Sequence, residues 1–167
     1  MNKVFGKKKS YAPIKEDASR VIISYGMESV DKNNATWIEI YLAKKQINHL
    51  SLDDVKAAII ADINAQTDEK ILSGFVWNGT TVWLSAENQR NFSEAQRLGI
   101  VPVTFKLGEQ EDGTPVYHTF DTTAELDGFY HQAAAYIQQC LQTGWYVKDN
   151  IDWTPYEAMF ELKESNM

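Results

Sequence analysis

The sequence is poor in cysteine and proline, and it contains no long hydrophobic run. Cys140 is the single cysteine, so the chain cannot form an internal disulfide, which agrees with a reducing compartment. No apolar stretch approaches the roughly 20 residues that span a bilayer. The N-terminal lysines are not followed by the apolar segment of a secretory signal. These absences predict a protein without a membrane partner.

Motifs of the common enzyme classes are also missing. The sequence has no nucleotide-binding glycine pattern, no nucleophile elbow and no HExxH zinc motif. His118 and His131 lie near Asp121 and Asp127 along the chain, but their spacing matches no compact metal-binding motif. Cys140 falls on the apolar stripe of a predicted helix, where cysteine usually acts as a small hydrophobe. We therefore predict no enzyme, no catalytic residue, no metal site and no cofactor.

Charge is unevenly distributed along the chain. The net charge is −7, yet residues 1–20 carry six basic and two acidic side chains. The acidic remainder should repel nucleic acid, so nucleic acid is an unlikely partner except through the basic N-terminal segment. Residues 1–19 are expected to form a basic arm, which is either a solvated tail or a segment that binds an acidic surface through Lys7, Lys8 and Lys9.

What the sequence does contain is a well-marked β-hairpin at residues 71–84. Asn78 and Gly79 lie between two β-prone runs, and both residues tolerate the positive φ of a type I′ turn. Trp77 and Trp83 flank this turn on alternating faces. Two arrangements stay open: both rings are covered, one by a helix and one by a neighbouring segment, or one ring faces solvent, where it could stack on a sugar or anchor a protein partner.

Helix signals alternate with the strand signals. Ser51, Ser85 and Thr122 are predicted N-caps, and the last two open helices that end near Gly99 and Gly144. Core-facing stripes are predicted from apolar spacing; they include Val55, Ile59, Ile63, Phe92, Leu126, Phe129, Tyr130, Ala133, Ile137, Cys140 and Leu141. Strands are expected at residues 20–25, 36–43, 101–107 and 114–120, and a short helix is expected to begin at Thr154.

These signals predict an α+β fold of successive β-hairpin-then-helix units. A hairpin alone is marginally stable, so the hairpins are expected to share one antiparallel sheet with the helices packed on one face. The predicted organisation is the arm at residues 1–19, an α+β domain at residues 20–153, and a short C-terminal helix and tail at residues 154–167. Whether residues 20–50 join the main sheet or form a separate lobe stays open.

Residues 51–153 carry a family resemblance. The helix of type L-x-x-x-K-x-x-x-I-x-x-I-N, beginning at Leu52, is followed by the hairpin that ends in Val82-Trp83-Leu84. A later strand pair precedes a capped helix with Leu126 and Phe129. This arrangement resembles an uncharacterised domain of tailed-bacteriophage and prophage proteins, often encoded near tail-fibre genes. The family has no established catalytic residues, so the resemblance implies none here.

The resemblance implies a virion structural protein of the phage tail region, made in the bacterial host cytoplasm. We expect it to dock onto other tail or fibre proteins and to form a homo-oligomer. The candidate docking residues are Lys7, Lys8, Lys9, Trp77, Trp83, Tyr156 and Phe160. Two alternatives stay open. One is a tail-fibre assembly chaperone, whose transient partner face would be the polar helix at residues 86–98 and the stripe of Tyr156, Met159 and Phe160. The other is a glycan-binding adhesion module that uses an outward tryptophan.

Overall fold

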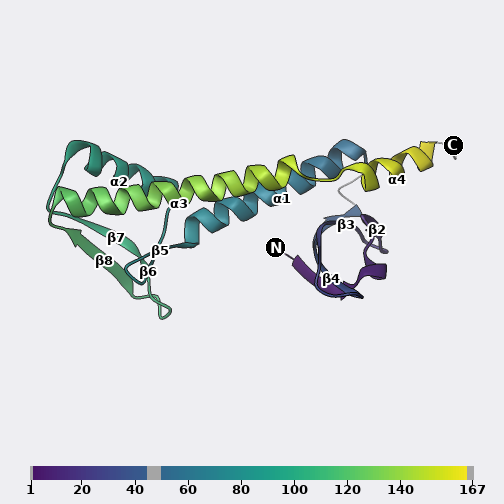
Figure 1. The fold of residues 1–167 in the computed structure, drawn as a ribbon, viewed down its shortest axis with the longest axis horizontal. Coiled ribbons are helices and arrows are strands. Elements are labelled where there is room, and N and C mark those ends of the chain that lie inside the picture. Colours follow the sequence, from purple (N-terminus) through teal and green to yellow (C-terminus); the bar gives the residue numbers. More distant parts are fainter. Residues whose placement is uncertain (1, 45–49, 165–167) are drawn as a thin grey trace. The chain divides into compact units, whose positions relative to one another are not determined.

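The computed structural model describes residues 2–44 and 50–164 of the chain, which divide into two compact units (Figure 1). Unit 1 consists of Met1–Asn64 and Val147–Met167, and unit 2 of Ala65–Tyr146. The predicted ranges also include Met1 and residues 45–49 and 165–167, which lie outside the described residues. None of the helices in the described part combines the length and the apolar character of a membrane span.

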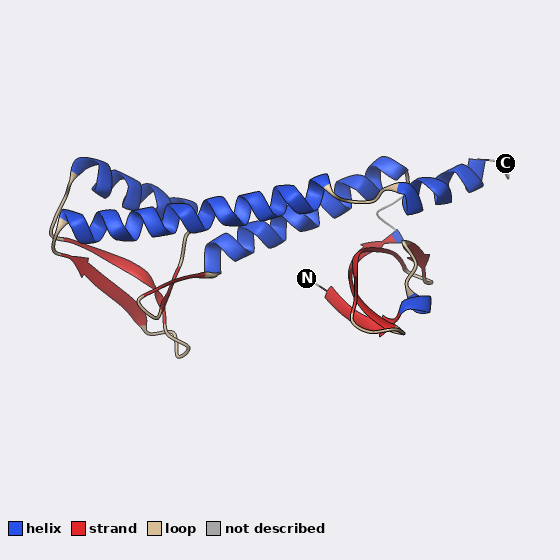
Figure 2. Ribbon diagram, in the orientation of Figure 1, coloured by secondary structure: helices blue, strands red, loops and turns tan. Residues whose placement is uncertain are grey.

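Unit 1 contains a four-stranded antiparallel sheet. Its strands are β1 (Asn2–Lys7), β2 (Ile14–Glu16), β3 (Arg20–Ser29) and β4 (Asn34–Ala43), in the spatial order β1-β4-β3-β2. A short 3₁₀ turn, η1 (Lys8–Ser10), follows β1. The sheet is strongly curled (Figures 1 and 2).

One face of this sheet forms the core of unit 1. Val21 and Ile23 of β3 pack with Val55 and Ile59 of helix α1 (Leu52–Ser73), as the spacing of the helical residues predicts. Tyr156 of α4 (Thr154–Glu164) completes this core. Its hydroxyl donates a 2.6 Å hydrogen bond to the backbone oxygen of Ser24, so α4 is fastened to the sheet.

Unit 2 has two hairpins and its own core. The hairpins are β5 (Phe75–Trp77) with β6 (Thr80–Val82), and β7 (Val103–Glu109) with β8 (Pro115–Phe120). Helices α2 (Ala86–Leu98) and α3 (Thr123–Asp149) lie on one side of β7 and β8 (Figure 2). Phe129 is fully buried at the centre, within 5.1 Å of the ring centroids of Trp77, Phe92 and Phe120.

The local turn and cap signals are confirmed. Asn78 and Gly79 have φ values of 48° and 79°, as a type I′ turn requires. Ser85 Oγ accepts a hydrogen bond from the Asn88 amide, and Gly99 adopts the left-handed conformation that ends α2. The prediction that the next helix stops at Gly144 is wrong. Gly144 is buried within α3, where an added Cβ would lie 2.5 Å from Thr67 Oγ1, so this glycine serves close helix packing.

The α+β class, with helices packed against antiparallel sheets, is confirmed, but the expected single sheet and single interior are not found. The described strands form three separate sheets, and two clusters of buried side chains replace one core. The physical reason lies in the N-terminal residues. β1 and β2 pair with the outer sides of β4 and β3, which are the positions where a later hairpin would have joined the β3–β4 hairpin.

The expected arm at residues 1–19 is thereby corrected as well. β1 pairs with β4 from Asn2 opposite Glu39 to Lys7 opposite Asn34, and β2 pairs with β3. Residues 20–43 belong to this sheet and do not join the hairpins of unit 2. The N-terminal segment is therefore part of a folded sheet, and it presents its lysines from a fixed backbone.

Candidate functional site

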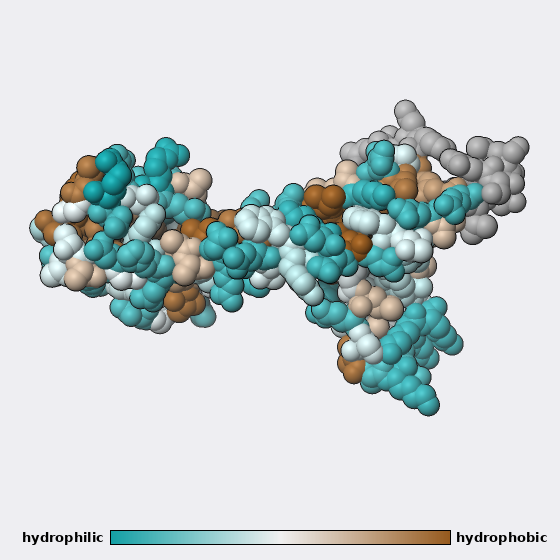
Figure 3. Space-filling model, turned by 45° about the horizontal axis from the view of Figure 1, so that its top comes forward, coloured by the Kyte–Doolittle hydropathy of each residue, from teal (hydrophilic) through white to brown (hydrophobic). Residues whose placement is uncertain are grey.

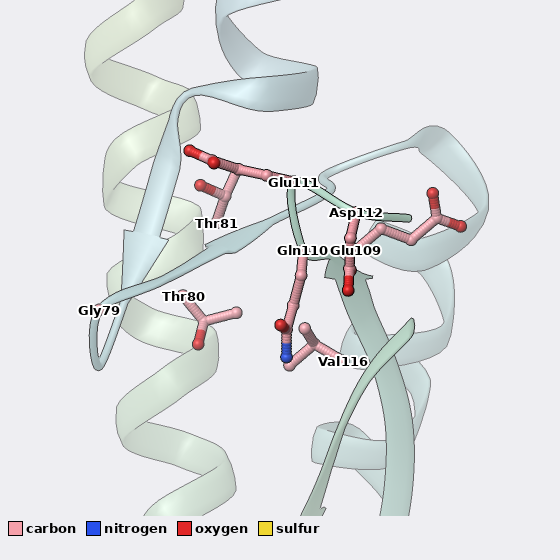
Figure 4. A pocket seen from close by; sticks show the side chains of 8 residues that line it. All are labelled: Gly79, Thr80, Thr81, Glu109, Gln110, Glu111, Asp112 and Val116. Carbon is pink, nitrogen blue, oxygen red and sulfur yellow. The ribbon is translucent and has the colours of Figure 1, made fainter. Parts of the chain in front are cut away.

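A polar cleft lies where the two hairpins of unit 2 meet. Its volume is about 670 Å³. It is lined by the β5–β6 turn, the β7–β8 loop and the strand ends beside them, with Gly79, Thr80, Thr81, Glu109, Gln110, Glu111, Asp112 and Val116 (Figure 4). Thr80 and Gln110 reach into the same space from opposite sides, and Glu111 lies beside Thr81 (Figure 4). The cleft is therefore rich in oxygen atoms and carries negative charge.

A backbone contact holds the two hairpins together. The Trp83 amide donates a 2.7 Å hydrogen bond to the Leu107 oxygen, which joins the end of β6 to β7. The pairing of β7 with β8 shifts register between Lys106 and Gly108, so Leu107 is an extra, bulged residue. An added Cβ on Gly108 would lie 2.6 Å from the Thr81 oxygen, so only glycine allows this close approach.

Trp83 stands next to this junction and is 37% exposed. The Lys106 ammonium lies 5.4 Å from the centroid of the Trp83 ring and 2.7 Å from Glu109 Oε1. This cation–π contact and ion pair connect the tryptophan to the wall of the cleft. The indole is thus a fixed, partly exposed aromatic surface beside an acidic cleft.

The charge of the β7–β8 loop is stabilised by its own turn. Hydrogen bonds from the backbone and side chain of Thr114 hold the pKa of Asp112 below its usual value. The Gln110 amide bonds to the Thr114 oxygen, and the Gly113 amide bonds to the Gln110 oxygen. Asp112 is therefore ionised at neutral pH, and the cleft attracts cations and hydrogen-bond donors.

Two predicted docking residues are corrected by their burial. Trp77 is 7% exposed and packs among Phe120, Phe129 and His118. Tyr156 is 2% exposed and holds α4 to the sheet. Their side chains stabilise the two cores, because each ring points toward the layer that covers it and away from solvent. Of the two hairpin tryptophans, Trp83 is the one that a partner can reach.

The remaining predicted docking residues lie at or near the surface of unit 1. Lys7 ends β1 and Lys9 lies in η1, and both are exposed. Lys8 is half-buried, and its backbone amide donates to the Asn33 oxygen. Phe160 is half-buried against the core of unit 1.

The histidines and the cysteine have structural surroundings. His118 Nε2 lies 2.9 Å from Glu125 Oε1, and its ring packs edge-on against Trp77 and Phe120. His131 is exposed, and Cys140 is buried in the core of unit 2. Within residues 2–44 and 50–164, no group of three or more histidine, cysteine, aspartate or glutamate side chains could hold a metal ion.

One polar network was missed at the sequence level. Glu39, 8% exposed, accepts hydrogen bonds from Trp37 Nε1 at 2.9 Å, Tyr41 at 2.8 Å and Lys15 at 3.2 Å. Burial raises the pKa of Glu39, but these donors outweigh it and hold the pKa below its usual value. The alternation of Trp37, Glu39 and Tyr41 along one strand face was the available signal. The network fixes the face of the sheet opposite the core.

These features define an α+β protein with two cores and a polar cleft between paired hairpins. Residues 54–164 match the model of a family described as a domain of unknown function (DUF4376). Because this match spans more than half of the chain, the protein belongs to that family. No curated protein and no solved structure matches the chain.

The family match does not coincide with a structural unit. It includes α4, which the resemblance over residues 51–153 left out, and it omits β1 to β4. Val21 and Ile23 nevertheless share a core with Val55 and Ile59. In this protein the family region therefore needs the N-terminal sheet to cover the first half of α1.

Proposed function

We propose that this protein is a non-enzymatic structural component of a tailed bacteriophage or prophage, associated with the tail or its fibres. It would act by docking onto other tail or fibre proteins in the virion, after synthesis in the bacterial cytoplasm. The resemblance of residues 51–153 to a domain often encoded near tail-fibre genes supports this association. Membership in a family of unknown function is compatible with it and adds no activity.

The observation that carries the docking proposal is the placement of Trp83. Tryptophan is enriched among the residues that dominate binding energy, and rigid placement lowers the entropy lost on association. Trp83 is held by the Leu107 backbone bond and by Lys106, yet 37% of it remains exposed. Hydrophobic residues on the face shown in Figure 3 form separate groups among hydrophilic ones. A partner would therefore be recognised by a local aromatic anchor with polar surroundings.

The direct test is mass spectrometry of purified particles of the encoding phage, combined with complementation by variants. We expect the wild-type protein at stoichiometric level and Trp83→Ala to reduce incorporation at least about tenfold. Phe5→Ala is the matched control, because Phe5 is 65% exposed but lies in unit 1. Absence of the wild-type protein from particles would refute the virion role and favour a transient assembly chaperone. Equal incorporation of both variants would remove Trp83 as the anchor.

A homo-oligomer is the proposed assembly state, since tail components rarely occur as single copies. Lys7 and Lys9 are exposed on unit 1, and among the described residues neither lysine has an ion pair, so they offer a basic surface to acidic neighbours. Deletion of the N-terminal residues would remove β1 and β2 from the sheet, so charge reversal is the better test. Light scattering should show Lys7→Glu/Lys9→Glu at lower mass than wild type. Unchanged mass would exclude docking through these lysines.

A glycan-binding role is the second candidate, favoured by the position of Trp83 beside a cleft lined with hydroxyl, amide and carboxylate groups. Lys106 covers one face of the indole, so a sugar would stack on the other part of the ring. A glycan array should then show a ligand that Trp83→Ala loses and Phe5→Ala keeps. An array without any ligand would reject this role.

A further inference from the structure

A second cavity lies between α2 and α3, within unit 2 and apart from the hairpin cleft. Its volume is about 290 Å³, close to the lower limit of small-molecule pockets. Its apolar lining includes Leu84, Phe92 and Ile137, and its polar lining includes Arg90, Ser93 and Tyr130. None of these residues belongs to the surface proposed for docking.

The apolar part of this cavity is rigid. Leu84 and Phe92 are each 2% exposed and belong to the core of unit 2. The Phe92 ring makes edge-on contacts with Phe105 at 4.9 Å and Phe129 at 5.0 Å between centroids. Because these rings hold one another in place, the side chains cannot collapse into the space at low cost. The cavity is therefore preformed for an apolar group.

The polar lining of the cavity includes one cationic side chain, Arg90, which is exposed. Among the described residues, no hydrogen bond or ion pair engages the side chains of Arg90, Ser93 or Tyr130. The other arginine of α2 differs, because Arg97 pairs with Glu94 at 3.7 Å. Acidic side chains outnumber basic ones in this protein, whose net charge is −7, and yet Arg90 has no carboxylate partner in the part of the chain that the structure describes. Its guanidinium is therefore suited to bind the carboxylate of a ligand through two parallel hydrogen bonds.

We propose that this cavity binds a free small carboxylate with an apolar body, such as an arylalkanoate or a medium-chain fatty acid. At roughly 30 Å³ per non-hydrogen atom, the volume of 290 Å³ accommodates about ten such atoms. The apolar body lies against Leu84, Phe92 and Ile137. The carboxylate binds Arg90, with the hydroxyls of Ser93 and Tyr130 as further donors. This inference does not rest on the proposed docking function.

The test is an NMR titration of the full-length protein with 3-phenylpropionate and, separately, with the neutral 3-phenylpropanol. We expect saturable shifts of amides in α2 and α3 with the acid, and binding about tenfold weaker with the alcohol. Equal affinity for the acid and the alcohol would overturn the assignment of Arg90. Shifts that do not saturate, or that map elsewhere, would overturn the site.

Two variants and a control make the test specific to the cavity. Arg90→Gln should weaken acid binding about tenfold, and Arg97→Gln, on the same helix but paired with Glu94, should leave it unchanged. Ala134→Trp fills the cavity from an exposed lining position and should abolish binding. If Ala134→Trp does not fold, the comparison of the two arginine variants decides alone. Equal loss in both arginine variants would refute the proposal.

Discussion

Replacing Gly108 by alanine should force the two hairpins of unit 2 apart. The added methyl group would lie 2.6 Å from the Thr81 oxygen and 3.6 Å from Trp83 Cδ1. The closer atom belongs to the backbone, so it cannot rotate away as the end of a long side chain would. Relief requires β6 and β7 to separate, and their separation stretches the 2.7 Å hydrogen bond from Trp83 to Leu107.

The expected loss follows from two terms. Overpacking of a buried site costs about 1–3 kcal/mol, and loss of the connecting hydrogen bond costs about 1 kcal/mol. Gly108→Ala should therefore lower the free energy of unfolding by about 2–4 kcal/mol. Gly128→Ala is the matched control, because Gly128 lies in α3 with nothing within 4 Å of an added Cβ. Alanine there should raise the free energy of unfolding by about 0.5–1 kcal/mol.

Urea unfolding followed by far-UV circular dichroism measures both changes. Phe129 lies in the core of unit 2, so the transition that Phe129→Ala shifts is the one that reports the unfolding of this unit. A change below about 0.5 kcal/mol in Gly108→Ala would refute the close approach of β6 and β7. A loss of the same size in Gly128→Ala would show that any added methyl group destabilises this unit, and the steric argument would fail.

Four further substitutions test other parts of the structure. Phe129→Ala should cost about 3–5 kcal/mol in a denaturant melt, because its ring is fully buried among aromatic neighbours. Ser85→Ala should cost only about 1 kcal/mol, and a loss as large as that of Phe129→Ala would contradict the assignment of the core. Glu39→Gln should cost about 2 kcal/mol at neutral pH. Because the folded-state pKa of Glu39 lies below 4.5, wild-type stability should hold above about pH 4.5 and fall in more acidic buffer. In thermal melts across pH 2–7, Glu39→Gln should not show this acid-dependent loss of stability. Tyr156→Phe should cost about 1 kcal/mol, because it removes the hydrogen bond to the Ser24 oxygen. Burial raises the pKa of Tyr156 above 10.0, so wild-type stability should hold below pH 10 and decline above it. An alkaline decline in Tyr156→Phe as large as that of wild type would contradict this origin.

The local elements were predictable because their signals lie within a few residues of one another. Asn78-Gly79 specifies its turn without any distant contact, and Ser85 caps a helix whose ends agree with the prediction. The stripe that contains Phe129 follows directly from helical spacing. Long-range pairing has no such signal. β1 is an edge strand with exposed lysines and an exposed Phe5, so its sequence reads as a polar arm.

The candidate site was predictable only in part for the same reason. Alternation placed Trp77 and Trp83 on opposite faces, and the structure decides that Trp83 is the exposed one. The cleft itself depends on a contact between the two hairpins at Trp83 and Leu107, which are 24 residues apart in the sequence, and no local pattern encodes this contact. Tyr156 resembled a surface residue of a terminal helix because the sheet that buries it lies at the other end of the sequence.

The core of unit 1 has a consequence for the order in which the chain can mature on the ribosome. Tyr156 completes the core against strands that end at Ala43, but the ribosome adds Tyr156 more than a hundred residues later. At a synthesis rate of roughly 5–20 residues per second, the sheet of unit 1 lacks the Tyr156 side chain for several seconds or longer. The contiguous segment Ala65–Tyr146 leaves the ribosome whole in the meantime. Termination of synthesis between Tyr146 and Tyr156 would therefore leave unit 2 complete and unit 1 with an incomplete core.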